Sequence, residues 1–313
     1  MKSRIWLALI AIYIAWGSTY LAIRFAVESM PPFLMAATRF LIAGMAVYIW
    51  RRMAGDPTPT RAQWRSASVI GLFLLLGGNG GVTWAEQSVD SGIAAIVVAS
   101  APFWMVLIDA LRPGGQRPTW QVSAGVLLGL AGIAILVTPD RSPAKSLGFD
   151  LFGVAALLLA ALSWAIGSIY GRGADLPKSP LLGTGMEMLA GSAGLFIAGT
   201  ISGEWGRLEL ASINARSLWG LTYLVVVGSL VGFVAYSWLI RVAPMPVVST
   251  YAYVNPLIAV ILGSLLAQEV LTTRVLLAAP IIVSSVALIN VARFKVAPLA
   301  PARLAVYAAP GED

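Results

Sequence analysis

The chain is divided into apolar stretches of about 20 residues by short polar breaks. A helix of about 20 residues crosses the hydrocarbon core of a bilayer. The chain is 58% hydrophobic and only 11% charged, whereas soluble domains are about 25% charged, so it is too apolar for a soluble fold. The sequence therefore predicts an all-α integral membrane protein with ten transmembrane helices. The predicted spans are approximately 5–26, 32–50, 66–84, 91–111, 119–138, 151–170, 181–201, 217–239, 246–267 and 274–293.

Lys and Arg residues are distributed unequally between the breaks. When the N-terminus is placed in the cytoplasm, most of them lie inside, including Arg51, Arg52, Arg61 and Arg65, as the positive-inside rule requires. The first apolar stretch is longer than the 7–15 residues, roughly, of a signal-peptide core. We therefore expect an uncleaved first span and two cytoplasmic termini.

The two halves of the chain share rare residues at a nearly constant spacing. The matched pairs are Trp16 with Trp164, Arg24 with Arg172, Pro32 with Pro180, Trp84 with Trp238, and Pro102 with Pro256. A copy of five spans is odd in number, so the second copy starts from the opposite side of the membrane and the repeats are inverted. We predict a first repeat over 1–145, a second over 146–295 and a disordered cytoplasmic tail over 296–313. The alternative is an accidental match.

Four stretches together resemble the drug/metabolite transporter superfamily, with the EamA-type exporters as the closest group. They are WGSTYLAIR from Trp16, PPFLMAATRFLIAG from Pro31, SGIAAIVVASAP from Ser91 and YAYVNPLIAVILGSLLAQE from Tyr251. The resemblance covers about residues 5–293. It implies an exporter of small metabolites or drugs in the bacterial inner membrane, with a central cavity between the halves. It does not name the substrate, because the superfamily carries amino acids, sugars, nucleotide sugars and amphiphilic cations.

Two opposite charges stand at equivalent positions of the two repeats. Arg39 and Glu187 each lie seven residues past a matched proline, inside apolar runs. Charged groups within a membrane are costly and face a partner or a cavity. We expect both in the central cavity, and the alternative is a purely structural pair or an arginine that braces backbone carbonyls. Because the chain has no His, Glu187 is the candidate for proton coupling.

Three other carboxylates are placed near the ends of the predicted spans. Glu86 and Asp109 are the alternative proton carriers, but their places near span ends favour an interfacial position for both, and Glu269 is expected at the interface in the same way. Helix breaks are predicted at Pro102 and Pro256, near the middle of spans four and nine, because proline removes a backbone donor.

Aromatic and amide side chains at depth are expected to complete the lining of the cavity. Such a lining suits an amphiphilic or cationic solute. With Arg39 and Glu187, the predicted substrate-binding residues are Trp16, Asn79, Trp164, Tyr251, Tyr253 and Asn255.

These observations favour a secondary-active transporter that exports amino-acid-like or amphiphilic and cationic solutes by alternating access. No catalytic residues, metal or cofactor are expected, because the chain has no Cys and no His and carries no ATP-binding motif. The expected partners are a small-molecule substrate, the bilayer and, if transport is coupled, protons; nucleic acid is not expected. Exchange without protons, a membrane-embedded enzyme and a receptor or scaffold are the alternatives, and the oligomeric state is left open.

Overall fold

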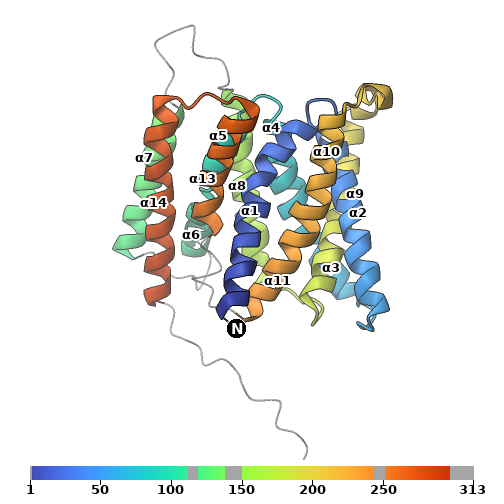
Figure 1. Ribbon diagram of the computed structural model, residues 1–313. Helices are drawn as coiled ribbons and strands as arrows, with labels where there is room; N and C mark the ends of the chain where they lie inside the picture. The colour runs from blue at the N-terminus through green and yellow to red at the C-terminus, as the bar shows by residue number, and fades with distance from the viewer. Residues whose placement is uncertain (1, 112–118, 138–149, 243–250, 297–313) are drawn as a thin grey trace, which may run out of the picture.

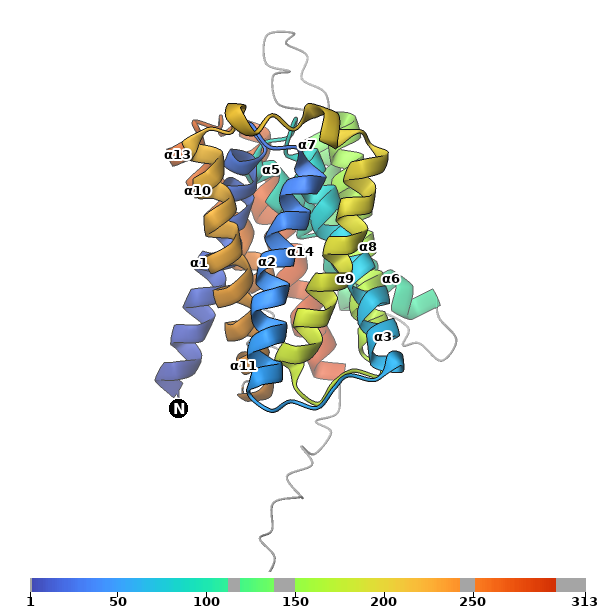
Figure 2. The same cartoon turned by 90° about the vertical axis from the view of Figure 1, so that its right-hand side faces the viewer.

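The computed structural model describes residues 2–111, 119–137, 150–242 and 251–296. Every regular element within these ranges is helical, and no strand occurs there. Figures 1 and 2 show the helices running side by side along one axis. We call the end at which the chain begins the N-terminal end. We call the opposite end, where the first helix finishes, the distal end. The predicted tail lies, except for Val296, outside the described residues.

The helices follow one another along the chain with short connections. In the first half they are α1 (Lys2–Ala26), α2 (Pro32–Met53), α3 (Arg61–Gly71), η1 (Leu72–Gly80), α4 (Gly81–Ala85), α5 (Ser91–Val98), α6 (Ala101–Leu111) and α7 (Trp120–Val137). In the second half they are α8 (Leu151–Gly171), α9 (Pro180–Ile201), η3 (Glu204–Arg207), η4 (Leu210–Ser212), α10 (Ala215–Tyr223), η5 (Leu224–Val231), α11 (Gly232–Val242), α13 (Tyr251–Ala267) and α14 (Thr273–Val296).

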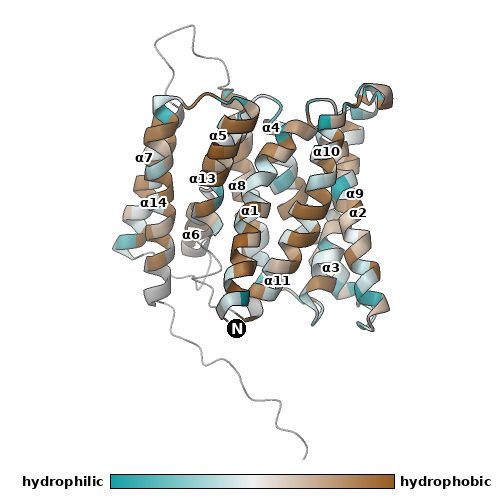
Figure 3. Ribbon diagram, in the orientation of Figure 1, coloured by the Kyte–Doolittle hydropathy of each residue, from teal (hydrophilic) through white to brown (hydrophobic). Residues whose placement is uncertain are grey.

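The lengths and outer faces of the helices are those of a membrane protein. Within the described ranges, seven helical segments are long and apolar enough to cross a bilayer, and three more are apolar but shorter. Large apolar side chains such as Leu127, Leu159 and Leu265 are exposed on the outside of the bundle, and Figure 3 shows hydrophobic residues along the outer helices. An exposed apolar exterior is costly in water and favourable in lipid. The chain is therefore an all-α membrane protein.

Local sequence explains where several helices begin. Pro32 and Pro180 occupy the first turn of α2 and α9, where the missing N–H of proline costs no hydrogen bond. The side chain of Asn214 accepts a hydrogen bond from the Ser217 N–H (2.8 Å) at the start of α10, as N-cap residues commonly do. These residues therefore account for where α2, α9 and α10 begin.

Two of the long segments contain π-helix at equivalent places. Segment η1 joins α3 to α4, and η5 joins α10 to α11 without a break. Both are apolar and contain glycine, as LFLLLGGNG and LVVVGSLV. A π-turn widens the helix, and such turns are frequent at functional sites. The predicted spans did not include this feature.

The two matched prolines have different effects on their helices. Helix α5 ends at Val98 and α6 begins at Ala101, so the helix is interrupted directly before Pro102. At Pro256, in contrast, helix α13 continues through the proline. The predicted break is thus present at Pro102, whereas Pro256 lies in a continuous helix.

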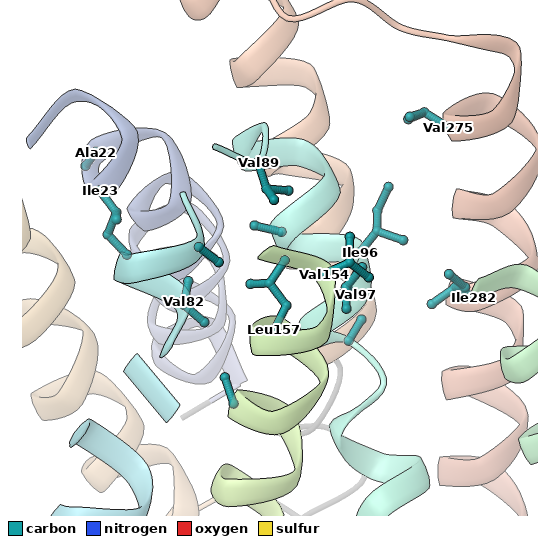
Figure 4. Close-up of a cluster of buried hydrophobic side chains, with 14 of the residues drawn as sticks. Ala22, Ile23, Val82, Val89, Ile96, Val97, Val154, Leu157, Val275 and Ile282 are labelled. Atoms are coloured by element: carbon teal, nitrogen blue, oxygen red, sulfur yellow. The ribbon is translucent and has the colours of Figure 1, made fainter. Parts of the chain in front are cut away.

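A large hydrophobic cluster closes the distal half of the bundle. Figure 4 shows side chains from several helices meeting there, including Ile23 of α1, Val82 of α4, Ile96 of α5, Leu157 of α8 and Ile282 of α14. These residues are nearly or fully buried. Their burial excludes water from the contacts between these helices.

Glycine allows two helices to approach closely beside Glu187. A Cβ added at Gly71 of α3 would lie 2.3 Å from the Glu187 main-chain oxygen, so no larger residue fits there. Helix α9 also packs along α2, while α7 packs along α14. Small residues at such contacts are typical of helix packing in membranes.

Candidate functional site

A cavity of about 230 Å³ lies between the two halves of the chain. Pockets for drug-sized ligands are commonly about 300–1,000 Å³, so this cavity suits one small solute. Helices α1, α2, α4, α5, α6, α8, α11 and α13 contribute to its wall, together with η1. Its polar and aromatic lining residues are Trp16, Thr19, Tyr20, Arg39, Asn79, Trp164, Phe233, Tyr251 and Asn255.

Trp16 anchors one wall of the cavity. Its indole Nε1 donates a hydrogen bond to the Gly228 main-chain oxygen in η5 (3.1 Å). Its ring lies 5.4 Å from Phe233, 5.2 Å from Tyr236 and 5.1 Å from Tyr251, measured between ring centroids. The contacts with Phe233 and Tyr251 are edge-to-face, and the contact with Tyr236 is tilted; edge-to-face contacts hold rings in defined orientations. The wall is therefore a fixed apolar surface.

Arg39 provides a positive charge at the cavity. Only 4% of the residue is exposed, yet it lines the cavity. Its Nε donates to the Ser229 hydroxyl of η5 (2.9 Å), and its guanidinium carbon lies 4.7 Å from the centroid of the Phe40 ring. Among the described residues the ion pairs join Arg51 to Asp56, Arg207 to Glu204 and Arg216 to Glu28, so none of them neutralises Arg39.

Glu187 is placed apart from this charge. It is half-buried on α9 and is not one of the residues that line the cavity. It forms no ion pair with Arg39 in the described part of the chain. The two equivalent charges therefore do not meet across the cavity.

Two amide side chains add hydrogen-bonding groups to the lining. Asn79 belongs to η1 and Asn255 to α13. Asn255 is 8% exposed, and its Oδ1 has no hydrogen-bond partner. A buried polar atom without a partner is costly, so the Asn255 side chain is an uncompensated polar group in the wall of the cavity.

The remaining predicted site residues divide into those at the cavity and one that is not described. Trp164 lines the cavity and packs against Gly78, where an added Cβ would lie 3.1 Å from its Cε3. Pro102 and Pro256 also line it. The side chain of Tyr253 lies outside the described residues, as does that of Asp109.

The sequence did not predict several residues that line the cavity, nor Ser229, which accepts the hydrogen bond from Arg39. Thr19 and Tyr20 belong to the quoted WGSTY stretch, which offered a signal for them. Phe233 and the support Ser229 lie in or directly after η5, and their placement depends on the π-helical turn. No group of three or more His, Cys, Asp or Glu that could hold a metal occurs in the residues that the structure describes.

Comparisons with known proteins agree with these features. The profile of the EamA-like transporter family matches residues 3–138 and 151–291. The "Uncharacterized inner membrane transporter YedA" of Escherichia coli strain K12 is 39% identical over 289 residues, which cover 92% of this chain and 90% of that protein.

More distant relatives cover the chain to a similar extent. An "Uncharacterized transporter" of Synechocystis is 25% identical and covers 91% of this chain and 89% of its own length. A solved crystal structure matches the fold with a TM-score of 0.61 at 20% identity, over 93% of this chain and 98% of that chain. The family match spans nearly the whole of both halves, and the chain belongs to the EamA-like transporter family.

Proposed function

We propose that this chain is a secondary-active transporter that exports a small solute across the bacterial inner membrane by alternating access. The observation that carries the proposal is the cavity between the two halves, which holds the guanidinium of Arg39 without a carboxylate partner in the described residues. Binding sites at the junction of repeats are typical of secondary transporters. Both termini are proposed to be cytoplasmic, with the distal end facing the periplasm.

Contacts exchanged between the halves support an inverted-repeat arrangement with ten spans. Trp16 of the first half contacts η5 of the second half through Gly228. Trp164 of the second half contacts η1 of the first half through Gly78. The matched tryptophans thus pack on equivalent π-helical segments of the opposite half, as two repeats related by a twofold axis would.

The closed distal end supports alternating access. The hydrophobic cluster around Ile23, Val82 and Leu157 packs between the helices beside the cavity, and Ile23 and Val82 also line it. In the proposed cycle this cluster separates when the cavity opens to the periplasm, and the N-terminal end closes in turn.

Among the expected solutes, the lining favours an amino-acid-like molecule that carries a carboxylate and an apolar body. Arg39 offers guanidinium N–H groups to a carboxylate, and the aromatic wall around Trp16 suits an apolar body. A cation would face an unneutralised positive charge. Proton coupling through Glu187 and exchange without protons are the two proposed ways to drive transport.

A binding screen followed by a transport assay tests the proposal. Purified protein is screened by thermal shift against amino acids, amines and sugars, together with tetraphenylphosphonium as a cationic probe. We expect amino acids with apolar side chains to raise the melting temperature. The best compound should then exchange across proteoliposomes that contain the protein but not across empty liposomes. Stabilisation by cations alone would overturn the substrate class, and equal flux in empty liposomes would overturn transport.

A further inference from the structure

A glutamate at the distal end is completely buried without a partner for its carboxylate. Glu86 directly follows α4, just after the membrane-spanning segment that ends at Ala85. It is 0% exposed, and neither Oε1 nor Oε2 has a hydrogen-bond partner. An ionised carboxylate in such a place would be very costly.

The charged and titratable groups around Glu86 do not neutralise it. From α1, Arg24 donates its Nη1 to the main-chain oxygen of Glu86 (2.7 Å) rather than to the carboxylate. From the connection between α13 and α14, the carboxylate of Glu269 interacts unfavourably with Glu86. Asp90, in the turn that leads to α5, lies within the influence of both Arg24 and Glu269. Tyr20 of α1 is also close enough to interact with Glu86.

Glu269 is held in place by three hydrogen bonds to Ser91 and Gly92. Its Oε1 accepts from the Ser91 N–H (2.8 Å) and the Ser91 hydroxyl (2.6 Å), and its Oε2 accepts from the Gly92 N–H (3.0 Å). These donors lie at the start of α5, where a negative charge is favourable. The Glu269 carboxyl group is therefore fixed in position near the buried Glu86.

Burial, followed by the charge of Glu269, raises the pKa of Glu86 well above its ordinary value. Arg24 acts in the opposite direction but more weakly than burial. Complete burial without a hydrogen-bond partner for either carboxyl oxygen thus favours the neutral form of Glu86.

Glu86 lies between the distal hydrophobic cluster and a residue of the cavity wall. Ala85 and Val89, on either side of it, are fully buried members of the distal hydrophobic cluster. Tyr20, which interacts with Glu86, is one of the residues that line the cavity. Ionised Glu86 would need water or the guanidinium of Arg24, and either one would have to enter the cluster.

We propose that Glu86 is a proton-binding site whose deprotonation opens the distal end of the transporter. This inference rests on the proposed alternating-access function, because it assigns protonated Glu86 to one of the two states of the transporter and ionised Glu86 to the other. The state with protonated Glu86 is closed at the distal end, and the state with ionised Glu86 admits water there.

Spin-label distances test this inference without any substrate. The chain has no cysteine, so Gln87→Cys with Thr273→Cys places one label pair at exposed distal positions of the α4–α5 turn and α14. We expect the label distances to lengthen between about pH 5 and pH 9 in this background. With Glu86→Gln added, the short distances should persist at every pH.

Two further variants keep the result interpretable. Glu86→Met gives an apolar side chain of similar length and should also stay closed, so it replaces Glu86→Gln if that variant does not fold. Glu209→Gln, an exposed glutamate at the same end, should retain the pH response of the parent. A pH response that survives in the Glu86 variants, or distances that do not change with pH in the parent, would overturn the inference. Failure of the liposome exchange assay would instead count against transport itself.

Discussion

The Trp16 indole of the first half donates a hydrogen bond to the Gly228 main-chain oxygen of the second half, at 3.1 Å. The acceptor belongs to η5, and the next residue, Ser229, accepts the hydrogen bond from Arg39. One π-helical turn therefore positions both the aromatic wall and the positive charge of the cavity.

Gly228→Ala should disrupt this turn. A Cβ at Gly228 would lie 2.8 Å from Thr19 Cγ2 and 3.0 Å from Arg39 Nη2, so the guanidinium must shift. We expect a loss of about 1–3 kcal/mol of stability, the usual cost of overpacking, together with weaker binding of carboxylate solutes. Thermal unfolding and thermal-shift titration measure the two effects. Gly206→Ala is the control, because no atom lies within 4 Å of its added Cβ; equal behaviour of the two variants would contradict the prediction.

Arg39→Gln should weaken binding of carboxylate solutes. A hydrogen bond to a charged group contributes about 1.5–3 kcal/mol, which corresponds to about 10- to 150-fold in affinity. Arg39→Lys keeps the charge but not the paired donors, so its affinity should fall between those of the parent and Arg39→Gln. Thermal-shift titration with the best carboxylate from the screen measures this order. Unchanged affinity in Arg39→Gln would show that the carboxylate binds elsewhere.

Glu187→Gln tests whether this glutamate carries protons. In proteoliposomes with an imposed pH gradient, the variant should lose gradient-driven accumulation of the screened solute. Exchange at equal pH should continue, because Glu187 does not line the cavity. Accumulation at the parental level under the gradient would remove Glu187 from the coupling mechanism.

Gly263→Ala should release the cap of α5. The added Cβ would lie 2.3 Å from Glu269 Oε2, which displaces the carboxylate from Ser91 and Gly92. Loss of a helix cap costs about 0.5–2 kcal/mol, so the melting temperature should fall. Gly173→Ala, with no atom within 4 Å of its added Cβ, should melt like the parent. A Gly263→Ala variant as stable as Gly173→Ala would argue against the cap.

Asp56→Asn should remove a pH-dependent contribution to stability outside the membrane. The Arg51 guanidinium donates two hydrogen bonds to Asp56 (both 2.8 Å), which lowers the pKa of this carboxyl. Because the pKa is lower in the folded state, the contribution is present above the ordinary value of about 3.9 and lost as pH falls below it. Its size should stay within about 1 kcal/mol.

Thermal unfolding of the parent and Asp56→Asn between about pH 3 and pH 7 measures this contribution. The two curves should converge at the acidic end. Asp175→Asn, an exposed aspartate, is the control and should follow the parent throughout. A difference that persists at the acidic end would point to a cause other than the Arg51 contact.

The helical bundle and the family were predictable from the sequence because apolar length and rare repeated residues carry that information. The positions of Trp16 and Trp164 around one space followed from the repeat, although their part in binding stays a prediction. Which side of its helix the Glu187 side chain occupies relative to the cavity was not predictable in the same way. Successive residues of a helix differ by about 100° in direction, so equivalence with Arg39 in sequence does not place both side chains at the same cavity.

The π-helical segments were also absent from the predicted spans. Hydropathy over about 20 residues does not distinguish a wide turn from an ordinary one, and the glycines in GGNGG allowed a packing explanation. Ser229 and Phe233 were therefore not among the predicted site residues, because their places at the site depend on that turn.

The wide turn of η5 makes the length of this segment as important as its composition. A π-turn behaves as an α-helix with one inserted residue. If the segment from Leu224 to Val231 kept all its residues but wound as an ordinary α-helix, every later position of α11 would rotate by about 100°. Phe233 and Tyr236 would then no longer face Trp16, although all the side chains that contact Trp16 would still be present. Homologues in which this segment has the same length but winds as an ordinary α-helix should therefore present a different wall to their solutes.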